Sequence, residues 1–169
     1  EDEEHMRWLP LHSLVEEVVA PHREFGIAIE VAPSDDGSPE PVGRRNPGIL
    51  FGLGNLIENA VDFASEKVVV EVRQDRELVE ITFIDDGPGF PTDVLTQIGV
   101  PCMNRKSRSN RENAGGLGLG LFIAKTLLER SGATLAFSNN VPEGGARVTV
   151  SWPREKMDAA SVVVMYADK

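Results

Sequence analysis

The run Gly115-Gly116-Leu117-Gly118-Leu119-Gly120-Leu121 alternates glycines with leucines. The apolar residues from Leu119 to Arg130 recur at helical spacing, so we expect a helix that begins in this run and stops near Gly132. Glycines just before a helix leave amides and the helix N-terminus free to meet phosphate oxygens. A flexible hinge explains the same glycines. The run lacks the Lys-Ser/Thr of one familiar phosphate loop and the βαβ context of the other, so its meaning depends on the residues upstream.

A polar stripe lies upstream, on a helix that should run from Pro47 to about Ala64 with Asn46 as its cap. Positions i, i+3, i+4 and i+7 share one helix face, and here they are Asn55, Glu58, Asn59 and Asp62. Mg²⁺ keeps several waters and takes one or two protein oxygens plus phosphates, so a neutral Asn amide suits it. A solvated helix face is the alternative interpretation.

A second polar cluster, Asp85-Asp86-Gly87-Pro88-Gly89-Phe90, ends a β-prone run. A carboxylate at this position can accept a hydrogen bond from an exocyclic amino group, and residues without Cβ let the backbone approach a planar ring. Guanine carries an oxygen at that position, so Asp85 favours adenine. A plain turn after a strand is the alternative interpretation.

The three clusters, in this order and spacing, resemble the N, G1 and G2 boxes of the ATP-binding catalytic domain of sensor histidine kinases. This domain belongs to the GHKL superfamily, with gyrase B, MutL and a heat-shock chaperone. The resemblance covers roughly residues 9–153. Residues 55–64 and 122–133 especially resemble the redox-responsive RegB/PrrB/ActS sensor kinases.

The resemblance implies Mg-ATP as ligand, with Mg²⁺ on Asn59, the phosphates near Asn55 and the adenine amino group on Asp85. Glu58 would help to position water or phosphate. The implied catalytic residues are Asn55, Glu58 and Asn59. The implied nucleotide-binding residues are Asn55, Asn59, Asp62, Asp85, Gly87, Gly89, Arg105, Lys106, Gly116, Leu117, Gly118, Leu119 and Gly120.

Two departures from the family pattern concern the phosphate end of the site. Asp62 stands where many sensor kinases have a basic residue, and Arg105 or Lys106 either supplies that charge or belongs to a solvated basic loop. Gly99-Val100-Pro101-Cys102 replaces the segment that anchors the lid in the family. A free cysteine is usually a small apolar residue, so we expect no redox role for Cys102.

Apolar periodicity predicts an α/β two-layer sandwich, with a mixed, mostly antiparallel sheet of about five strands covered on one face by about three helices. The resemblance implies the same architecture, the Bergerat ATP-binding fold. Strands are predicted near 27–31, 67–74, 78–85, 133–138 and 146–152. Helices are predicted near 11–25, 47–64 and 119–130, with a short one from about Pro91. Residues 33–47 should form an exposed loop.

The resemblance divides the chain into three parts. Residues 1–8 form an acidic remnant of the linker from a dimerisation domain, residues 9–153 form the ATP-binding domain with a lid at about 99–114, and residues 154–169 form a C-terminal tail. None of the three histidines fits the phosphoacceptor pattern of a sensor kinase. The acceptor is therefore expected on another domain.

Composition limits the partners and the compartment. A net charge of −10 over 169 residues repels nucleic acid, and a single cysteine fits a reducing compartment. No apolar stretch reaches the ~20 residues that cross a bilayer. We expect a cytoplasmic domain without direct membrane contact, and the resemblance implies that the full-length protein is anchored in the inner membrane.

The function implied is transfer of the ATP γ-phosphoryl group to a histidine on a separate dimerisation and phosphotransfer domain, with a response regulator downstream. One alternative is a GHKL-type ATPase module that ATP drives to close. Asn55 stands where such ATPases carry a Glu that activates water, which disfavours hydrolysis. An anti-sigma-type serine kinase is the other alternative, and the RegB-like stretches argue against it.

Overall fold

A computed structural model describes residues 8–98, 111–140 and 143–158 of the chain, with the backbone alone for 111–118. The central sheet has five strands in the order β2-β4-β5-β7-β6. Its strands are β2 (Ala28–Asp35), β4 (Lys67–Gln74), β5 (Leu78–Asp85), β6 (Thr134–Asn139) and β7 (Ala146–Pro153). The β2–β4 pair is parallel and the other pairs are antiparallel, so the prediction of a mixed, mostly antiparallel sheet is confirmed.

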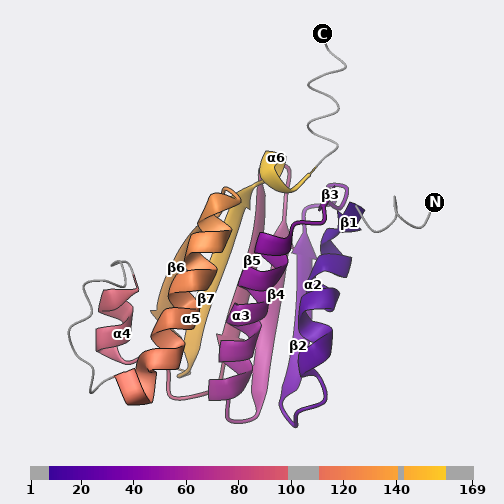
Figure 1. The fold of residues 1–169 in the computed structure, drawn as a ribbon. Coiled ribbons are helices and arrows are strands. Elements are labelled where there is room, and N and C mark those ends of the chain that lie inside the picture. The colour runs from indigo at the N-terminus through magenta and orange to yellow at the C-terminus, as the bar shows by residue number, and fades with distance from the viewer. Residues whose placement is uncertain (1–7, 99–110, 141–142, 159–169) are drawn as a thin grey trace.

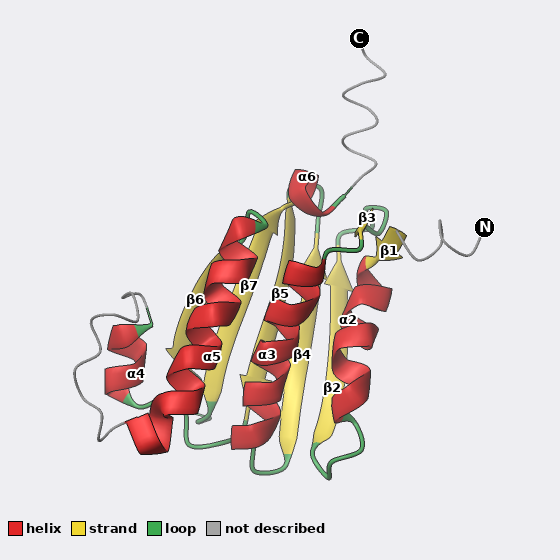
Figure 2. Ribbon diagram, in the orientation of Figure 1, coloured by secondary structure: helices red, strands yellow, loops and turns green. Residues whose placement is uncertain are grey.

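Three helices cover one face of this sheet, side by side (Figures 1 and 2). They are α2 (Leu11–Val19), α3 (Pro47–Phe63) and α5 (Arg111–Arg130). Smaller elements lie around this sandwich: β1 (Trp8–Pro10), η1 (Ala20–His22), β3 (Val42–Arg44), α4 (Thr92–Gln97) and α6 (Arg154–Met157). The two-layer α/β sandwich is therefore the observed fold.

The core lies between the helices and one face of the sheet. Along β4, Val68, Val70 and Val72 point to the helices and are buried, whereas Glu71 and Arg73 point to the other face and are exposed. This alternation is what a sheet with one covered face requires. On the other face, Arg147 forms an ion pair with Glu71 across the sheet at 3.7 Å.

Helix α3 begins where its sequence predicts. The Asn46 side chain accepts hydrogen bonds from the amides of Gly48 and Ile49, and Pro47 occupies the first turn. On the face toward α5, Gly52 leaves room for Leu128, because a Cβ at Gly52 would lie 2.7 Å from a carbon of that leucine. This close approach sets α3 against α5 and so places the residues further along both helices.

Four predicted boundaries differ from the structure. The first helix ends at Val19 instead of Phe25, since Pro21 has no amide to continue the α-helical hydrogen bonds. Strand β2 runs on to Asp35, which pairs with Gln74, because β4 offers it a partner along its whole length. Strand β3 lies within the predicted 33–47 loop, where it pairs with β1. Helix α5 begins at Arg111 instead of Leu119, so the glycine run is helical.

The first residues of the predicted C-terminal tail pack against the sandwich. The Arg154 guanidinium donates to Gln74 Oε1 at 3.1 Å and to the Asp75 carbonyl at 2.8 Å, beside the β4–β5 hairpin. It also pairs with Asp158 at 3.0 Å, and both side chains are nearly buried. Ordered packing therefore extends to Asp158.

Candidate functional site

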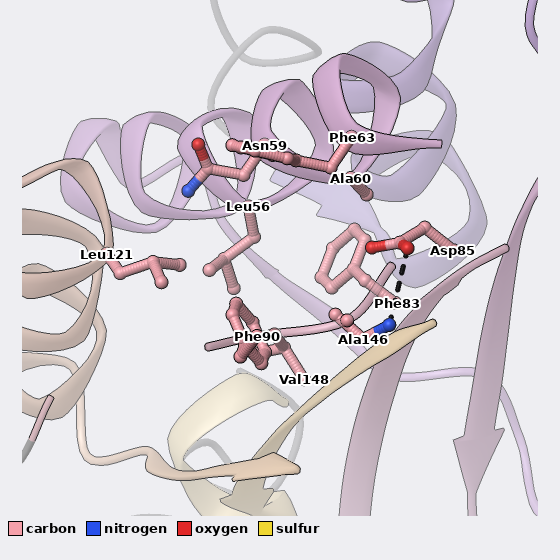
Figure 3. A pocket seen from close by; sticks show the side chains of 11 residues that line it. Leu56, Asn59, Ala60, Phe63, Phe83, Asp85, Phe90, Leu121, Ala146 and Val148 are labelled. Atoms are coloured by element: carbon pink, nitrogen blue, oxygen red, sulfur yellow. Dashed lines mark hydrogen bonds between the residues drawn. The ribbon is translucent and has the colours of Figure 1, made fainter. Parts of the chain in front are cut away.

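A pocket opens where α3, α5 and one end of the sheet meet (Figure 3). It holds about 410 Å³ of empty space, counting the part that is open to solvent. Its lining is mostly apolar, with one carboxylate and one carboxamide. The lining residues are Leu56, Asn59, Ala60, Phe63, Phe83, Asp85, Gly89, Phe90, Leu121, Ala146 and Val148. Such a mixture suits a planar, mostly apolar ligand with a few polar edges.

Asp85 is the charged residue of this pocket and stands at the end of β5. It is only 5% exposed, and one carboxylate oxygen accepts from the amides of Gly87 at 2.9 Å and Ala146 at 3.3 Å. Burial raises the pKa of Asp85, and these amide hydrogen bonds offset part of the rise. Both of these hydrogen bonds fall on Oδ1, which leaves Oδ2 as an acceptor for a donor in the pocket.

Three glycines around Asp85 are required by close contacts. A Cβ at Gly87 would lie 2.0 Å from the carbonyl oxygen of Phe63, and one at Gly145 would lie 1.8 Å from that of Asp85. Gly89 has φ +85° and Gly145 has φ +93°, which side-chain-bearing residues rarely adopt. These contacts let the loop after β5 and the turn before β7 close tightly around Asp85.

Asp86, the next residue, binds backbone amides between α3 and β4. Its carboxylate accepts from the amides of Ser65 at 2.7 Å and of Glu66 and Lys67 at 3.1 Å. Burial by itself would raise the pKa of Asp86, but these amides outweigh it and hold the pKa below its ordinary value. Asp86 thus fastens the end of α3 to the loop that carries Gly87.

Asn59 is the polar residue contributed by α3 (Figure 3). Its amide nitrogen is buried without a hydrogen-bond partner, and it lies 3.9 Å from the position of a Cβ on Gly120. A buried polar atom left without a partner is costly, so a bound group is a natural partner for it. Asn55 is partly exposed, and Glu58 and Asp62 are exposed on the same helix, so of the four stripe residues Asn59 alone lines the pocket.

The glycine run reaches this site as part of a helix. Gly116, Leu117, Gly118, Leu119 and Gly120 all lie within α5. An α-helical amide bonds to the carbonyl four residues before it, so the expected arrangement of free amides just before a helix is wrong for this structure. Leu121, at the end of the run, is fully buried and lines the pocket.

Some predicted site residues lie where the structure gives no test of them. Conversely, some residues that line the pocket were not predicted. Arg105, Lys106, Cys102 and residues 99–110 of the predicted lid lie outside the described residues. The unpredicted pocket residues are Leu56, Ala60, Phe63, Phe83, Phe90, Leu121, Ala146 and Val148. Apolar residues in helices and strands carry no sequence signal that separates pocket lining from core.

A protein-family model described as "Histidine kinase-, DNA gyrase B-, and HSP90-like ATPase" matches residues 48–156, which hold Asn59, Asp85 and the glycine run. The chain belongs to this family. Membership implies that it binds ATP.

Curated relatives narrow the resemblance to sensor kinases. The chain is 40% identical to the sensor histidine kinase RegB of Cereibacter sphaeroides over 173 residues, which cover 92% of this chain and 37% of RegB. It is 35% identical to the sensor protein kinase CarS of Pseudomonas aeruginosa, over 72% of this chain and 27% of CarS. The predicted resemblance to RegB-type sensor kinases is confirmed, and the chain spans well under half the length of these relatives.

Solved structures agree on the fold. The catalytic domain of histidine kinase ThkA matches with a TM-score of 0.66 at 21% identity, over 87% of this chain and 96% of that one. A mycobacterial sensor histidine kinase, MprB, matches with a TM-score of 0.63 at 19% identity, over 86% of this chain and 95% of that one. Within the described residues, no helix is long and apolar enough to cross a membrane.

Proposed function

We propose that the chain is the ATP-binding catalytic domain of a two-component sensor histidine kinase, which delivers the ATP γ-phosphoryl group to a histidine on a separate dimerisation domain. The observation that carries the proposal is Asp85, a buried carboxylate that faces an apolar pocket. The loop after β5 and the turn before β7 pack closely around it, and their contacts require glycines. The similarity to RegB over 92% of the chain supports the kinase reaction over the hydrolysis of ATP.

The residues of this chain bind and orient the nucleotide in this proposal. Asp85 accepts a hydrogen bond from the adenine amino group, while Phe90 and Leu56 contact the ring from the apolar walls. The base so held points its phosphates toward Asn59 and α5. Transfer between phosphate and histidine depends mostly on in-line placement and charge neutralisation, so a fixed base is the chief contribution of this pocket.

Asn59 fits a magnesium site. Its buried amide nitrogen has no hydrogen-bond partner and, as a donor, would face a phosphate oxygen, while its carboxamide oxygen would hold Mg²⁺. Among the residues that the structure describes, no three His, Cys, Asp or Glu side chains gather into a metal cluster. A single neutral oxygen suits Mg²⁺, which prefers water and phosphate for its remaining positions. When bound, Mg²⁺ would neutralise phosphate charge. Asn55 lies one turn before Asn59 and would approach the phosphates from the same helix.

The amides of Gly116, Gly118 and Gly120 contribute to phosphate binding only if the start of α5 unwinds. We include this change in the proposal, together with the lid residues Arg105 and Lys106 as suppliers of positive charge. Glycine is the poorest helix former after proline, so a helix that contains this run is easily unwound.

The partners and the place of action belong to the same proposal. The dimerisation domain supplies the histidine, a response regulator receives the phosphoryl group, and the reaction takes place in the cytoplasm. The full-length protein would be anchored in the inner membrane. A redox stimulus rests on the RegB resemblance alone.

Phosphotransfer with radiolabelled ATP and Mg²⁺ tests this function. We expect label on an added RegB-type dimerisation domain that is lost in acid and kept in base, as phosphohistidine requires. Little free phosphate should form when the chain is incubated alone. Steady phosphate release by the chain alone would favour the ATPase alternative, and label stable in acid would favour a serine kinase.

Asn59→Ala tests the metal assignment within this site. We expect the affinity for ATP to fall about tenfold in the presence of Mg²⁺ and to change little when Mg²⁺ is removed, since one charge-assisted contact is lost. Titration calorimetry with and without Mg²⁺ measures both values. Phe51→Ala, at an exposed position of the same helix, is the control for the loss of a side chain on α3.

A further inference from the structure

We infer that Asn139, at the end of β6, is a positioning residue for the nucleotide base, because its carboxamide holds Phe90 in the pocket wall. The inference rests on the proposed function, in which adenine occupies the pocket beside Asp85. Asn139 does not line the pocket, and it acts through the backbone of a residue that does.

The contact between the two residues has two hydrogen bonds. The Phe90 amide donates to Asn139 Oδ1 at 2.7 Å, and Asn139 Nδ2 donates to the Phe90 carbonyl at 3.1 Å. One side chain thus satisfies both backbone groups of one residue, as a neighbouring strand would do. The loop after β5 is in this way attached to β6, an edge strand two positions away in the sheet.

Phe90 transmits this attachment to the pocket. Its ring is 8% exposed, lines the pocket, and meets the ring of Phe137 edge to face at a centroid distance of 6.2 Å. Phe137 lies two residues before Asn139 on β6, so the ring and the backbone of Phe90 are both held by the same strand. An aromatic wall fixed on two sides is ready for a flat base before the base arrives.

The same carboxamide explains the requirement for Gly89. A Cβ on Gly89 would lie 2.8 Å from Asn139 Oδ1 and 3.1 Å from its Cγ. The strand end that carries Asn139 leads into the turn of Gly145, which packs on the backbone of Asp85. Asn139 therefore lies between the two backbone segments that enclose Asp85.

The chemistry of the contact favours asparagine. A carboxamide offers one acceptor and two donors on a single planar group, which matches an amide and a carbonyl of the same residue. An aspartate would keep the acceptor for the Phe90 amide but repel the Phe90 carbonyl. A serine reaches with one oxygen and keeps at most part of the contact.

The test measures ADP and inosine diphosphate binding to the full chain by calorimetry, at a temperature where circular dichroism shows each variant folded. We expect Asn139→Ala to weaken the binding of both nucleotides by the same factor, about fivefold, because the exposed Asn139 side chain contributes roughly the free energy of one net hydrogen bond to the position of Phe90. Asn139→Asp and Asn139→Ser should fall between the wild type and Asn139→Ala. Asn140→Ala is the matched control, since Asn140 joins the same turn through its backbone amide and carbonyl, and it should bind like the wild type.

Any other outcome contradicts either the positioning role of Asn139 or the proposed function on which it rests. Unchanged ADP affinity in folded Asn139→Ala overturns the positioning role. A change in the ratio of the two affinities overturns it as well, because that ratio reports the base edge read by Asp85. If Asn139→Ala does not fold, the same criteria apply to Asn139→Ser. Failure of the wild type to bind ADP overturns the proposed function instead, and that result is seen before any variant is compared.

Discussion

Two glycine-containing regions contribute to the site, and the structure treats them differently. Around Asp85, Gly87, Gly89 and Gly145 are each required by a close backbone contact or a positive φ. In α5, the Asn59 side chain is the one described group near Gly120, at 3.9 Å from the position of a Cβ, which is an ordinary contact. The loop and turn around Asp85 can adopt their conformation only with glycines. The helical conformation at Gly120 does not require a glycine.

The glycines around Asp85 are needed for the folded pocket. In our proposal, the glycines of residues 115–120 are needed when the start of α5 unwinds to bind phosphate. Each glycine in a helix costs about 1 kcal/mol relative to alanine, so the four glycines of residues 115–120 weaken the start of α5. A ligand that binds the unwound segment would then face a small conformational cost. The comparison therefore predicts opposite effects for the same substitution in the two regions.

Gly145→Ala should produce the largest effect. The new Cβ would lie 1.8 Å from the Asp85 carbonyl oxygen at a φ of +93°, so we expect a loss of more than about 3 kcal/mol in the free energy of unfolding. Urea denaturation measures this value. Gly144→Ala is the matched control, because Gly144 has φ +87° in the same turn and no atom of the described residues lies within 4 Å of its Cβ position, so it should cost only about 1–2 kcal/mol. Equal losses in the two variants would show that φ alone, and not contact with Asp85, fixes the turn.

Asp85→Asn should separate binding from stability in the region of fixed glycines. The asparagine oxygen can still accept from Gly87 and Ala146, but an amide group would face the base amino group in place of an acceptor. We expect ADP affinity to fall by about 2 kcal/mol, roughly thirtyfold, and the preference over inosine diphosphate to shrink.

The stability of the same variant should depend on pH. The folded-state pKa of Asp85 is raised, so the wild type loses stability as the pH rises from the unfolded pKa through the folded one. Asp85→Asn lacks this loss and should be the more stable protein at neutral pH. Denaturation curves at acidic and neutral pH check this, and a wild type that gains stability across that window would contradict the cause given for the pKa.

Asp86→Ala should give a smaller loss, about 1 kcal/mol after solvent screening, because the three amides between α3 and β4 lose their acceptor. The folded-state pKa of Asp86 is lowered, so its contribution is present above the unfolded pKa and is lost as the pH falls through the folded pKa. The difference between wild type and variant should therefore vanish in acid. A difference that persists in acid would assign the effect to packing.

Gly120→Ala should have the smallest effect on stability and the opposite sign. We expect a gain of up to about 1 kcal/mol in the free energy of unfolding, because alanine favours the helix that the structure shows. ATP affinity should fall in the same variant if phosphate binding unwinds this segment. Gly54→Ala in α3, where nothing lies within 4 Å of a Cβ, should give the same gain without a change in affinity. Unchanged ATP affinity in Gly120→Ala would place the phosphates on a helical α5.

Local sequence signals were enough for much of the fold. The bounds of β4 and β5 and the cap of α3 follow from apolar alternation and from Asn46-Pro47. The predicted start of the helix at Leu119 was wrong, because a pattern of glycines cannot show whether neighbouring helices stabilise that segment as a helix. The pocket walls were missed for a similar reason, since Phe90 and Val148 are apolar residues like any in the core until the chain is folded.

Sequence alone was enough to predict the main helices and the five strands of the central sheet, to place Asp85 at the end of a strand next to two glycines, and to place Asn59 on one helix stripe with other oxygen-bearing side chains. These depend on periodicity, caps and spacing within short segments. Packing of the folded chain sets which of the stripe residues reaches the pocket, which glycines are required by contact, and that Asn139 holds Phe90. Such facts depend on distances between segments that lie tens of residues apart, and these distances are set by packing of the whole sandwich.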